Sequence, residues 1–154
     1  MDYNSVFAIS AAGMNVERTR VEVAALNLAN ASTTHAAGES GYTPMRVVAR
    51  GGVDALSFTA LVDAGTEAAG LGQVNQLSQL SPSALIEPTG RSPRQVHEPG
   101  HPMADERGFV SYPGVDPATE MVSLMSANRA YEANVAAMNT ARTLALKALE
   151  IGGS

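Results

Sequence analysis

The sequence predicts an α+β fold that is mainly α, with long N- and C-terminal helices and a small, irregular β-rich region between them. Both ends are alanine-rich, have apolar residues at helical spacing and lack an internal proline. The stretch between them holds all but one of the eight prolines and most of the fourteen glycines, which favour turns over helices. A seven-residue apolar repeat at each end predicts that the two helices pack as a coiled coil or helical hairpin.

The apolar repeat also identifies a candidate subunit interface. A repeat of this length keeps one side of a helix facing a partner, either the other helix of the chain or a helix of a neighbouring chain. Near the start the repeat consists of Phe7, Met14, Val21 and Leu28. Near the end it runs through Leu124, Tyr131, Met138 and Ala145. The predicted interface residues are Phe7, Met14, Val21, Leu28, Leu124, Tyr131, Val135, Met138 and Leu149.

The first segment, residues 1–34, is predicted to be one helix followed by its terminating residues. Asn4 and Ser5 are residue types that accept hydrogen bonds from the free amides of a first helical turn. The apolar spacing continues to about Asn30, and the polar run at 31–34 ends it.

The middle segment, residues 35–113, is predicted to form a loop-rich β unit. Short apolar or β-branched runs between turn residues indicate strands. The candidates are Met45–Arg50, Phe58–Val62, Arg94–His97 and Gly108–Tyr112. Residues 64–93 are rich in Gly, Ser, Gln and Pro without a clear period, and we expect this stretch to be partly mobile.

The last segment, residues 114–154, is predicted to be a second long helix. Asp116 is a favourable N-cap, Pro117 suits the first helical position and Glu120 places negative charge in the first turn. Gly152 and Gly153 can adopt the left-handed conformation that ends a helix. Two polar residues interrupt the apolar stripe, and they indicate either a solvent-facing edge or groups that set the register: Asn128 and Arg142.

Composition narrows the classes of function. The net charge of −5 is unlike the clustered basic surface of a nucleic-acid binder. The chain has no cysteine, so disulfides and thiolate metal sites are excluded. The first residues lack the basic and apolar regions of a cleavable signal, and no apolar run is long enough to insert in a membrane. Because alanine buries little area, we expect a marginally stable monomer.

One short motif matches a zinc-hydrolase signature. His97, Glu98 and His101 satisfy H-E-x-x-H, in which two histidines one helical turn apart bind zinc and the glutamate activates water. That chemistry needs a helix, and Pro99, Gly100 and Pro102 oppose one here. The segment is therefore predicted to be a turn, and no cofactor is expected.

Three stretches resemble flagellar axial proteins, the family of rod, hook and filament-type subunits. The run 25–33 with Gly41–Tyr42 is similar to the N-terminal signature of that family, and 127–134 to its C-terminal helix. The longer string 98–121 resembles the proximal-rod members, although Gly114 stands where they often have asparagine. The residues that carry the resemblance are Asn27, Asn30, Tyr42, Pro99, Gly100, His101, Pro102, Asp105, Gly108, Asp116, Pro117, Glu120 and Met121.

The resemblance implies a structural subunit rather than an enzyme. Such proteins leave the cytoplasm unprocessed through the flagellar type III export apparatus. Their terminal helices pack with those of other rod proteins and of further copies of the same chain to form a helical tube that spans the periplasm in the basal body. The tube transmits torque from motor to hook. We expect the terminal helices to stay disordered until export, because alanine-rich surfaces bury too little area alone.

The residues leave alternatives open. Another axial protein of rod or hook type, or a divergent paralogue, would share the architecture. The zinc hydrolase using His97, Glu98 and His101 is the alternative from a different class. A helical-bundle regulator or export chaperone is a fourth, but it gives the proline-rich middle region no purpose.

Overall fold

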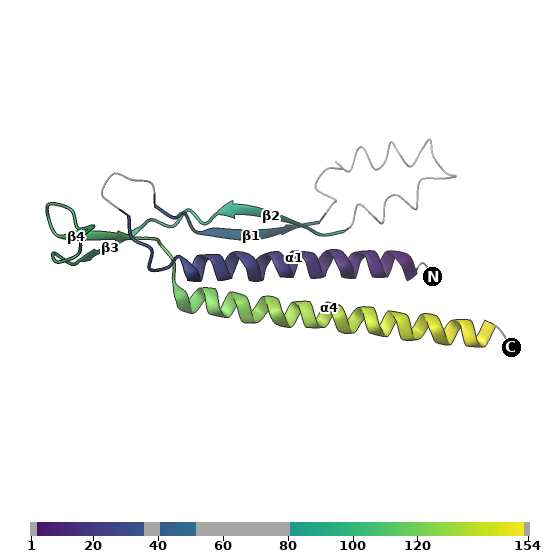
Figure 1. The fold of residues 1–154 in the computed structure, drawn as a ribbon. Coiled ribbons are helices and arrows are strands. Elements are labelled where there is room, and N and C mark those ends of the chain that lie inside the picture. The colour runs from purple at the N-terminus through teal and green to yellow at the C-terminus, as the bar shows by residue number, and fades with distance from the viewer. Residues whose placement is uncertain (1–2, 36–40, 52–80, 153–154) are drawn as a thin grey trace, which may run out of the picture. The chain divides into compact units, whose positions relative to one another are not determined.

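The computed structural model describes residues 3–35, 41–51 and 81–152. Its elements are two helices and four short strands, mainly helical in content and in agreement with the predicted α+β class (Figure 1). In chain order they are α1 (Tyr3–Ala29), β1 (Met45–Arg50), β2 (Ser83–Pro88), β3 (Arg94–His97), β4 (Phe109–Tyr112) and α4 (Pro117–Gly152).

The described chain divides into two compact units, and each contains part of both helices. The first unit holds residues 3–18, 49–51, 81–85 and 128–152. The second unit holds residues 19–35, 41–48 and 86–127. The second unit therefore contains the end of α1, the start of α4 and the strand pair β3–β4.

The start of α4 follows the predicted capping pattern. Pro117 is its first residue, and the N–H of Ala118 donates to Asp116 Oδ1 at 3.2 Å. The Thr119 hydroxyl donates to the other carboxylate oxygen of Asp116. These hydrogen bonds, first that of Thr119 and then that of Ala118, lower the pKa of Asp116 below its ordinary value, because they stabilise the charged carboxylate.

Helix α1 ends at Ala29, one residue before the expected end at Asn30. The side chain of Asn30 turns back, and its amide donates to the carbonyl of Leu26 at 2.9 Å. The N–H of Ala31 donates to the carbonyl of Leu28 at 3.2 Å. The last carbonyls of the helix are thus satisfied locally, which is how a helix can end without a glycine.

The strands form two separate two-stranded sheets, β1–β2 and β3–β4. Strand β1 and strand β3 coincide with the predicted ranges, and β4 begins one residue later than predicted. Strand β2 was not predicted, because its short apolar run, Leu85–Ile86, lies in a segment rich in turn residues. The candidate strand Phe58–Val62 lies outside the described residues.

The connection between β3 and β4 is a series of turns. In the β3–β4 ladder, which is antiparallel, His97 pairs with Phe109. Beyond it, Glu98 N–H donates to the Gly108 carbonyl at 2.8 Å, and His101 N–H donates to the Glu98 carbonyl at 3.0 Å. The zinc motif accordingly has no helix on which to place its two histidines. Within residues 3–35, 41–51 and 81–152, no group of three His, Asp or Glu side chains could hold a metal ion.

The core is built from small side chains. Among the described residues, the buried apolar ones come from both helices and from β4, and none of these is larger than valine: Val16, Val23, Ala24, Val110, Ala127 and Ala141. Small side chains let two helices approach closely but remove little apolar area from water. Neither described helix is long and apolar enough to cross a membrane.

Candidate subunit interface

Large apolar side chains lie on the outside of both helices. On α4 they are concentrated in the first two turns and at the C-terminal end, where Leu149 is 73% and Ile151 is 79% exposed. The exposed apolar residues of α1 and α4 are Val6, Ile9, Leu26, Met121, Val122, Met125, Tyr131, Leu144, Leu146, Leu149 and Ile151. Side chains of this kind commonly mark a surface that a partner covers.

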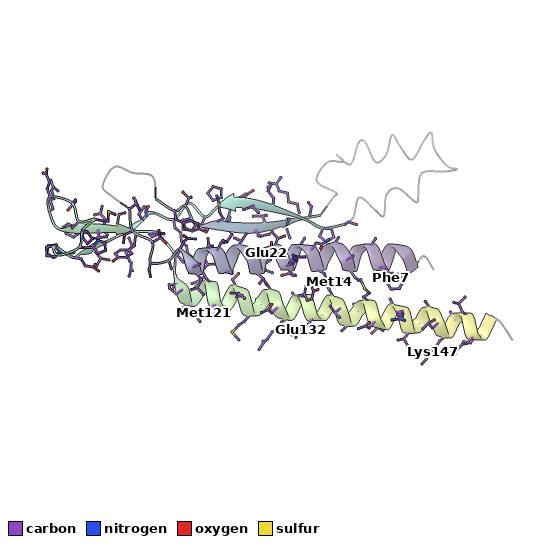
Figure 2. All side chains as sticks on the ribbon, viewed as in Figure 1. Phe7, Met14, Glu22, Met121, Glu132 and Lys147 are labelled. Atoms are coloured by element: carbon purple, nitrogen blue, oxygen red, sulfur yellow. The ribbon has the colours of Figure 1, made fainter. Side chains whose placement is uncertain are left out.

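The predicted interface residues fall into two groups in the isolated chain. Tyr131 and Leu149 are exposed. The others are half-buried: Phe7, Met14, Val21, Leu28, Leu124, Val135 and Met138. The buried valines of α1 are Val16 and Val23, which share the seven-residue spacing but lie two residues beyond Met14 and Val21. Figure 2 labels Phe7 and Met14 on α1 and Met121 on α4.

In the first unit the two helices meet at a glycine. A Cβ atom added to Gly13 would lie 3.1 Å from the side-chain amide atoms of Asn134 on α4. The amide of Asn134 donates to the carbonyl of Ala130 at 3.0 Å. In contrast, Asn128 and Arg142, which interrupt the apolar stripe in the sequence, are both exposed. The polar residue that lies against α1 in this unit is therefore Asn134.

In the second unit a buried asparagine joins three segments. Asn27 on α1 is 1% exposed. Its Nδ2 donates to the Met45 carbonyl at 2.7 Å and to Glu120 Oε2 on α4 at 3.2 Å. Its Oδ1 accepts from the Tyr42 hydroxyl at 2.8 Å and from the Met45 N–H at 3.1 Å. We call Asn27, Tyr42, Met45 and Glu120 the Asn27 cluster.

The Asn27 cluster uses the full hydrogen-bonding capacity of the asparagine amide, which has two N–H donors and an oxygen with two lone pairs. Its surroundings raise the pKa of the Tyr42 hydroxyl above the ordinary value of 10.0, through burial and then through the nearby Glu120 carboxylate. Tyr42 therefore keeps its proton and remains a donor to Asn27 over the neutral pH range.

Beside the cluster lies a hollow of about 270 Å³ between the end of α1, β1 and the start of α4. Its lining includes three arginines, Arg20, Arg46 and Arg91, and one carboxylate, Glu120. Among the described residues that line it there is no histidine and no second carboxylate, so these residues offer neither an acid–base pair nor a set of metal ligands.

Comparison with known proteins identifies the family. The model of the flagellar basal body rod FlgEFG protein C-terminal region matches residues 106–151. A flagellar basal-body rod protein FlgC of Escherichia coli O6:H1 is 32% identical over 148 residues, covering 96% of both chains. The FlgC proteins of Bacillus subtilis and Salmonella typhimurium are 35% and 33% identical over 150 and 148 residues, covering 94% and 96% of both chains. The chain belongs to the FlgC family.

Membership of the FlgC family makes this chain a structural subunit of the flagellar basal-body rod rather than an enzyme. The match also extends beyond the stretches that the sequence motifs covered. No motif was identified between residues 51 and 93, whereas the relatives align over nearly the whole chain.

Several of the residues that carry the resemblance in the sequence lie in the turns between β3 and β4. Asp105 Oδ1 accepts from the N–H groups of Arg107 and Phe109, at 2.9 and 2.7 Å. Gly108 adopts a positive φ of 79°, and a Cβ there would lie 3.0 Å from the Cβ of Pro99. Glycine is thus required by both conformation and space. Pro99, Gly100 and Pro102 lie in the same turns, and His101 Nδ1 accepts from Met103 N–H at 3.1 Å.

The remaining motif residues lie in the second unit, at or near the ends of the two helices. Asn30, Asp116 and Pro117 define where α1 ends and α4 begins, whereas Met121 is exposed. Asn27, Tyr42 and Glu120 form the cluster described above. The sequence marked these three as motif residues but gave no sign that they contact one another, because they are far apart along the chain.

Proposed function

We propose that this chain is a subunit of the proximal rod, polymerising through its terminal helices with further copies of itself and with other rod proteins. In this proposal the helices form part of a helical tube and help to transmit torque from motor to hook. The observation that carries it is the distribution of apolar side chains. The buried apolar residues described on α1 and α4 are alanines and valines, whereas several leucines, isoleucines and methionines and Tyr131 are exposed there.

The finer packing that we propose is an antiparallel coiled-coil hairpin of α1 and α4. Its support is the contact of Gly13 with Asn134 in the first unit and of Asn27 with Glu120 in the second. In such a pair Tyr3, ten residues before Gly13, comes level with Leu144, ten residues after Asn134. Roughly two turns of α4 then extend past the first described residue of α1 and present Leu146, Leu149 and Ile151 to neighbouring subunits.

A subunit that polymerises needs contacts in which one patch meets a different patch on the next copy, since identical self-complementary patches close into dimers. The exposed residues fit this requirement because they occupy separate places on α4. Met121, Val122 and Met125 lie in its first turns, and Leu144, Leu146, Leu149 and Ile151 lie near its end. The proposed interface residues remain the nine positions predicted from the seven-residue repeat.

We further propose that the chain is exported by the flagellar type III apparatus, with the parts of its terminal helices in the first unit, residues 3–18 and 128–152, disordered until then. The buried apolar side chains there, Val16 and Ala141, are small, which supports this. Hydrogen exchange on the purified monomer tests it. Rapid exchange is expected at residues 3–18 and 128–152, and strong protection of both stretches would contradict the proposal.

The assembly role is tested in the source organism. The gene is deleted and restored either at full length or truncated after Pro113, and hook–basal bodies are counted by electron microscopy. The proposal expects loss of rods in the deletion strain, recovery with the full chain and no recovery with the truncated one. Intact rods and normal swimming in the deletion strain would instead indicate a paralogue with another role.

The interface itself is tested at Tyr131, which is 41% exposed. Tyr131→Asp is expected to leave the middle region folded yet block rod assembly, because assembly would bury a charge where a ring should pack. Tyr131→Phe keeps the ring, and Asn139→Asp adds the same charge at another exposed position of α4. Both controls should assemble. Rods formed by Tyr131→Asp would show that the interface is misassigned.

A further inference from the structure

We infer that Asn27 is a positioning residue, which makes the pairing of α1 with α4 in the second unit conditional on docking of residues 42–45. This inference concerns the order in which segments of the free chain come together. It goes beyond the proposed role in the rod and does not depend on it.

The hydrogen bonds of Asn27 are divided unevenly between α4 and the segment 42–45. Of its four, one goes to α4, through Glu120 Oε2. The other three go to the segment 42–45, through the Tyr42 hydroxyl and through the N–H and carbonyl of Met45. Pairing of the two helices alone would therefore satisfy one quarter of the bonds that the amide can form.

The side chain of Asn27 is also buried. Asn27 and Val110 are the largest fully buried side chains of the described chain. A buried polar group left without partners loses its hydrogen bonds to water and receives nothing in exchange. Residues 42–45 supply three of the four bonds and lie directly on the amide, so they also supply part of its cover. The helix pair without them gains only the bond to Glu120 at this position and is less stable. Once residues 42–45 dock, all four bonds form and the amide is closed to water.

The segment 42–45 is itself held by the strand region. The Pro44 carbonyl accepts from the N–H of Thr89 at 2.8 Å, just after β2, and Arg46 forms an ion pair with Glu87 at 3.5 Å. Residues 42–45 thus join the Asn27 cluster on one side and the β1–β2 pair on the other. A chain whose middle region is not yet in place cannot complete the cluster, and its helices remain unpaired there.

The test is hydrogen exchange on the full-length chain at neutral pH, comparing the wild type with Asn27→Asp. This substitution keeps the shape but replaces the donor group by a carboxylate oxygen facing the Met45 carbonyl and Glu120. Exchange should accelerate together, by about tenfold or more, at Met45, at Thr89 and in the first three turns of α4. The matched control is Asn30→Asp, at a half-buried position whose side chain makes only exposed hydrogen bonds, and it should leave all three sets unchanged.

A compensating pair makes the test specific to the hydrogen bonds. In Asn27→Asp combined with Glu120→Gln, the glutamine amide can donate to the new carboxylate, so protection of α4 should return in part. Four results would overturn the inference: acceleration at Met45 and Thr89 with α4 unchanged, equal acceleration in Asn30→Asp, no recovery in the combined variant, or a wild type in which all three sets exchange as fast as an unfolded chain.

Discussion

The same two helices are held together differently in the two units. In the second unit the contact contains the fully hydrogen-bonded Asn27 together with Val23, Ala24 and Ala127, all buried. In the first unit Gly13 meets the side chain of Asn134, Ser10, Val16 and Ala141 are the buried residues, and the end of α4 exposes its leucines.

This difference separates two requirements on one helix pair. The second unit has the contacts that a chain needs to reach a defined fold by itself, because buried polar groups are specific in their partners. Larger apolar side chains are uncovered in both units: Met121, Val122 and Met125 in the second and Leu144, Leu149 and Ile151 in the first. The two units therefore differ in the polar contact between their helices and not in whether they expose apolar surface, and the proposed assembly would cover surfaces of both.

The proposed difference between the two helix contacts is tested most strongly by placing a charge in each of them. Ala127→Asp should destabilise the free chain by roughly 3 kcal/mol or more, because a carboxylate would be buried without a partner. Ala141 is also buried, but it lies in residues 128–152, which are proposed to be disordered in the free chain. Ala141→Asp should therefore cost the free chain about 1 kcal/mol or less but should prevent rod assembly. Denaturant unfolding and rod counts measure the two effects, and equal losses of stability would remove the distinction.

The two glycines that allow close approach should also respond differently. At Gly114 an added Cβ would lie 2.5 Å from the backbone oxygen of Ser92. Gly114→Asn should therefore destabilise the second unit by about 1–3 kcal/mol. Gly13→Ala in the first unit meets only a side chain that can move, and alanine favours the helix, so its effect should be close to neutral. Unfolding midpoints of the two variants test this, and a large loss in Gly13→Ala would contradict it.

A smaller effect should come from the Tyr42 hydroxyl. Tyr42→Phe removes one hydrogen bond to buried Asn27 and should lower the free energy of unfolding by about 1 kcal/mol. Tyr131→Phe, which removes an exposed hydroxyl in the first unit, should change it by less than about 0.5 kcal/mol. Identical unfolding curves for the two variants would mean that the cluster adds no stability.

The smallest effect should be the pH dependence of the α4 cap. The pKa of Asp116 is lowered in the folded chain. The stabilisation of the folded chain by its carboxylate is therefore fully present above the ordinary aspartate pKa. It is lost as pH falls through the lowered value. Asp116→Asn can still accept hydrogen bonds and should lack this acid-side decline. Helix content followed by circular dichroism between pH 6 and about 2 compares the two chains, and parallel curves would refute the prediction.

Much of the fold could be predicted from local patterns. The start of α4 was predictable because Asp116 and Pro117 act on residues within one turn. Strands β1 and β3 were predictable because apolar or β-branched runs lie between turn residues. Strand β2 was not, since its hydrogen bonds come from β1, more than thirty residues earlier, and its own sequence resembles a loop.

The contacts between helices were harder to predict. The spacing of apolar residues identifies one face of a helix but does not identify the partner that covers this face. The seven-residue repeat indicated Met14 and Val21, whereas Val16 and Val23 are the buried pair of α1. For Asn128 and Arg142 the sequence left open a solvent-facing edge or a register-setting role, and both residues are exposed. The residue that joins the segments is Asn27, whose role depends on Tyr42 and Glu120 arriving from distant parts of the chain.

The four bonds of Asn27 also limit what evolution or a designer can place at position 27. Aspartate supplies acceptors but no donor, serine has a single O–H donor in place of two N–H donors, and glutamine carries the right groups one methylene too far out. A sequence with substitutions at the exposed leucines of α4 can still fold by itself. A substitution at Asn27 instead requires matching changes in three segments at once. Among distant sequences with similar helical ends, an asparagine at this position together with matching partners is therefore a sharper criterion of shared architecture than the apolar repeat.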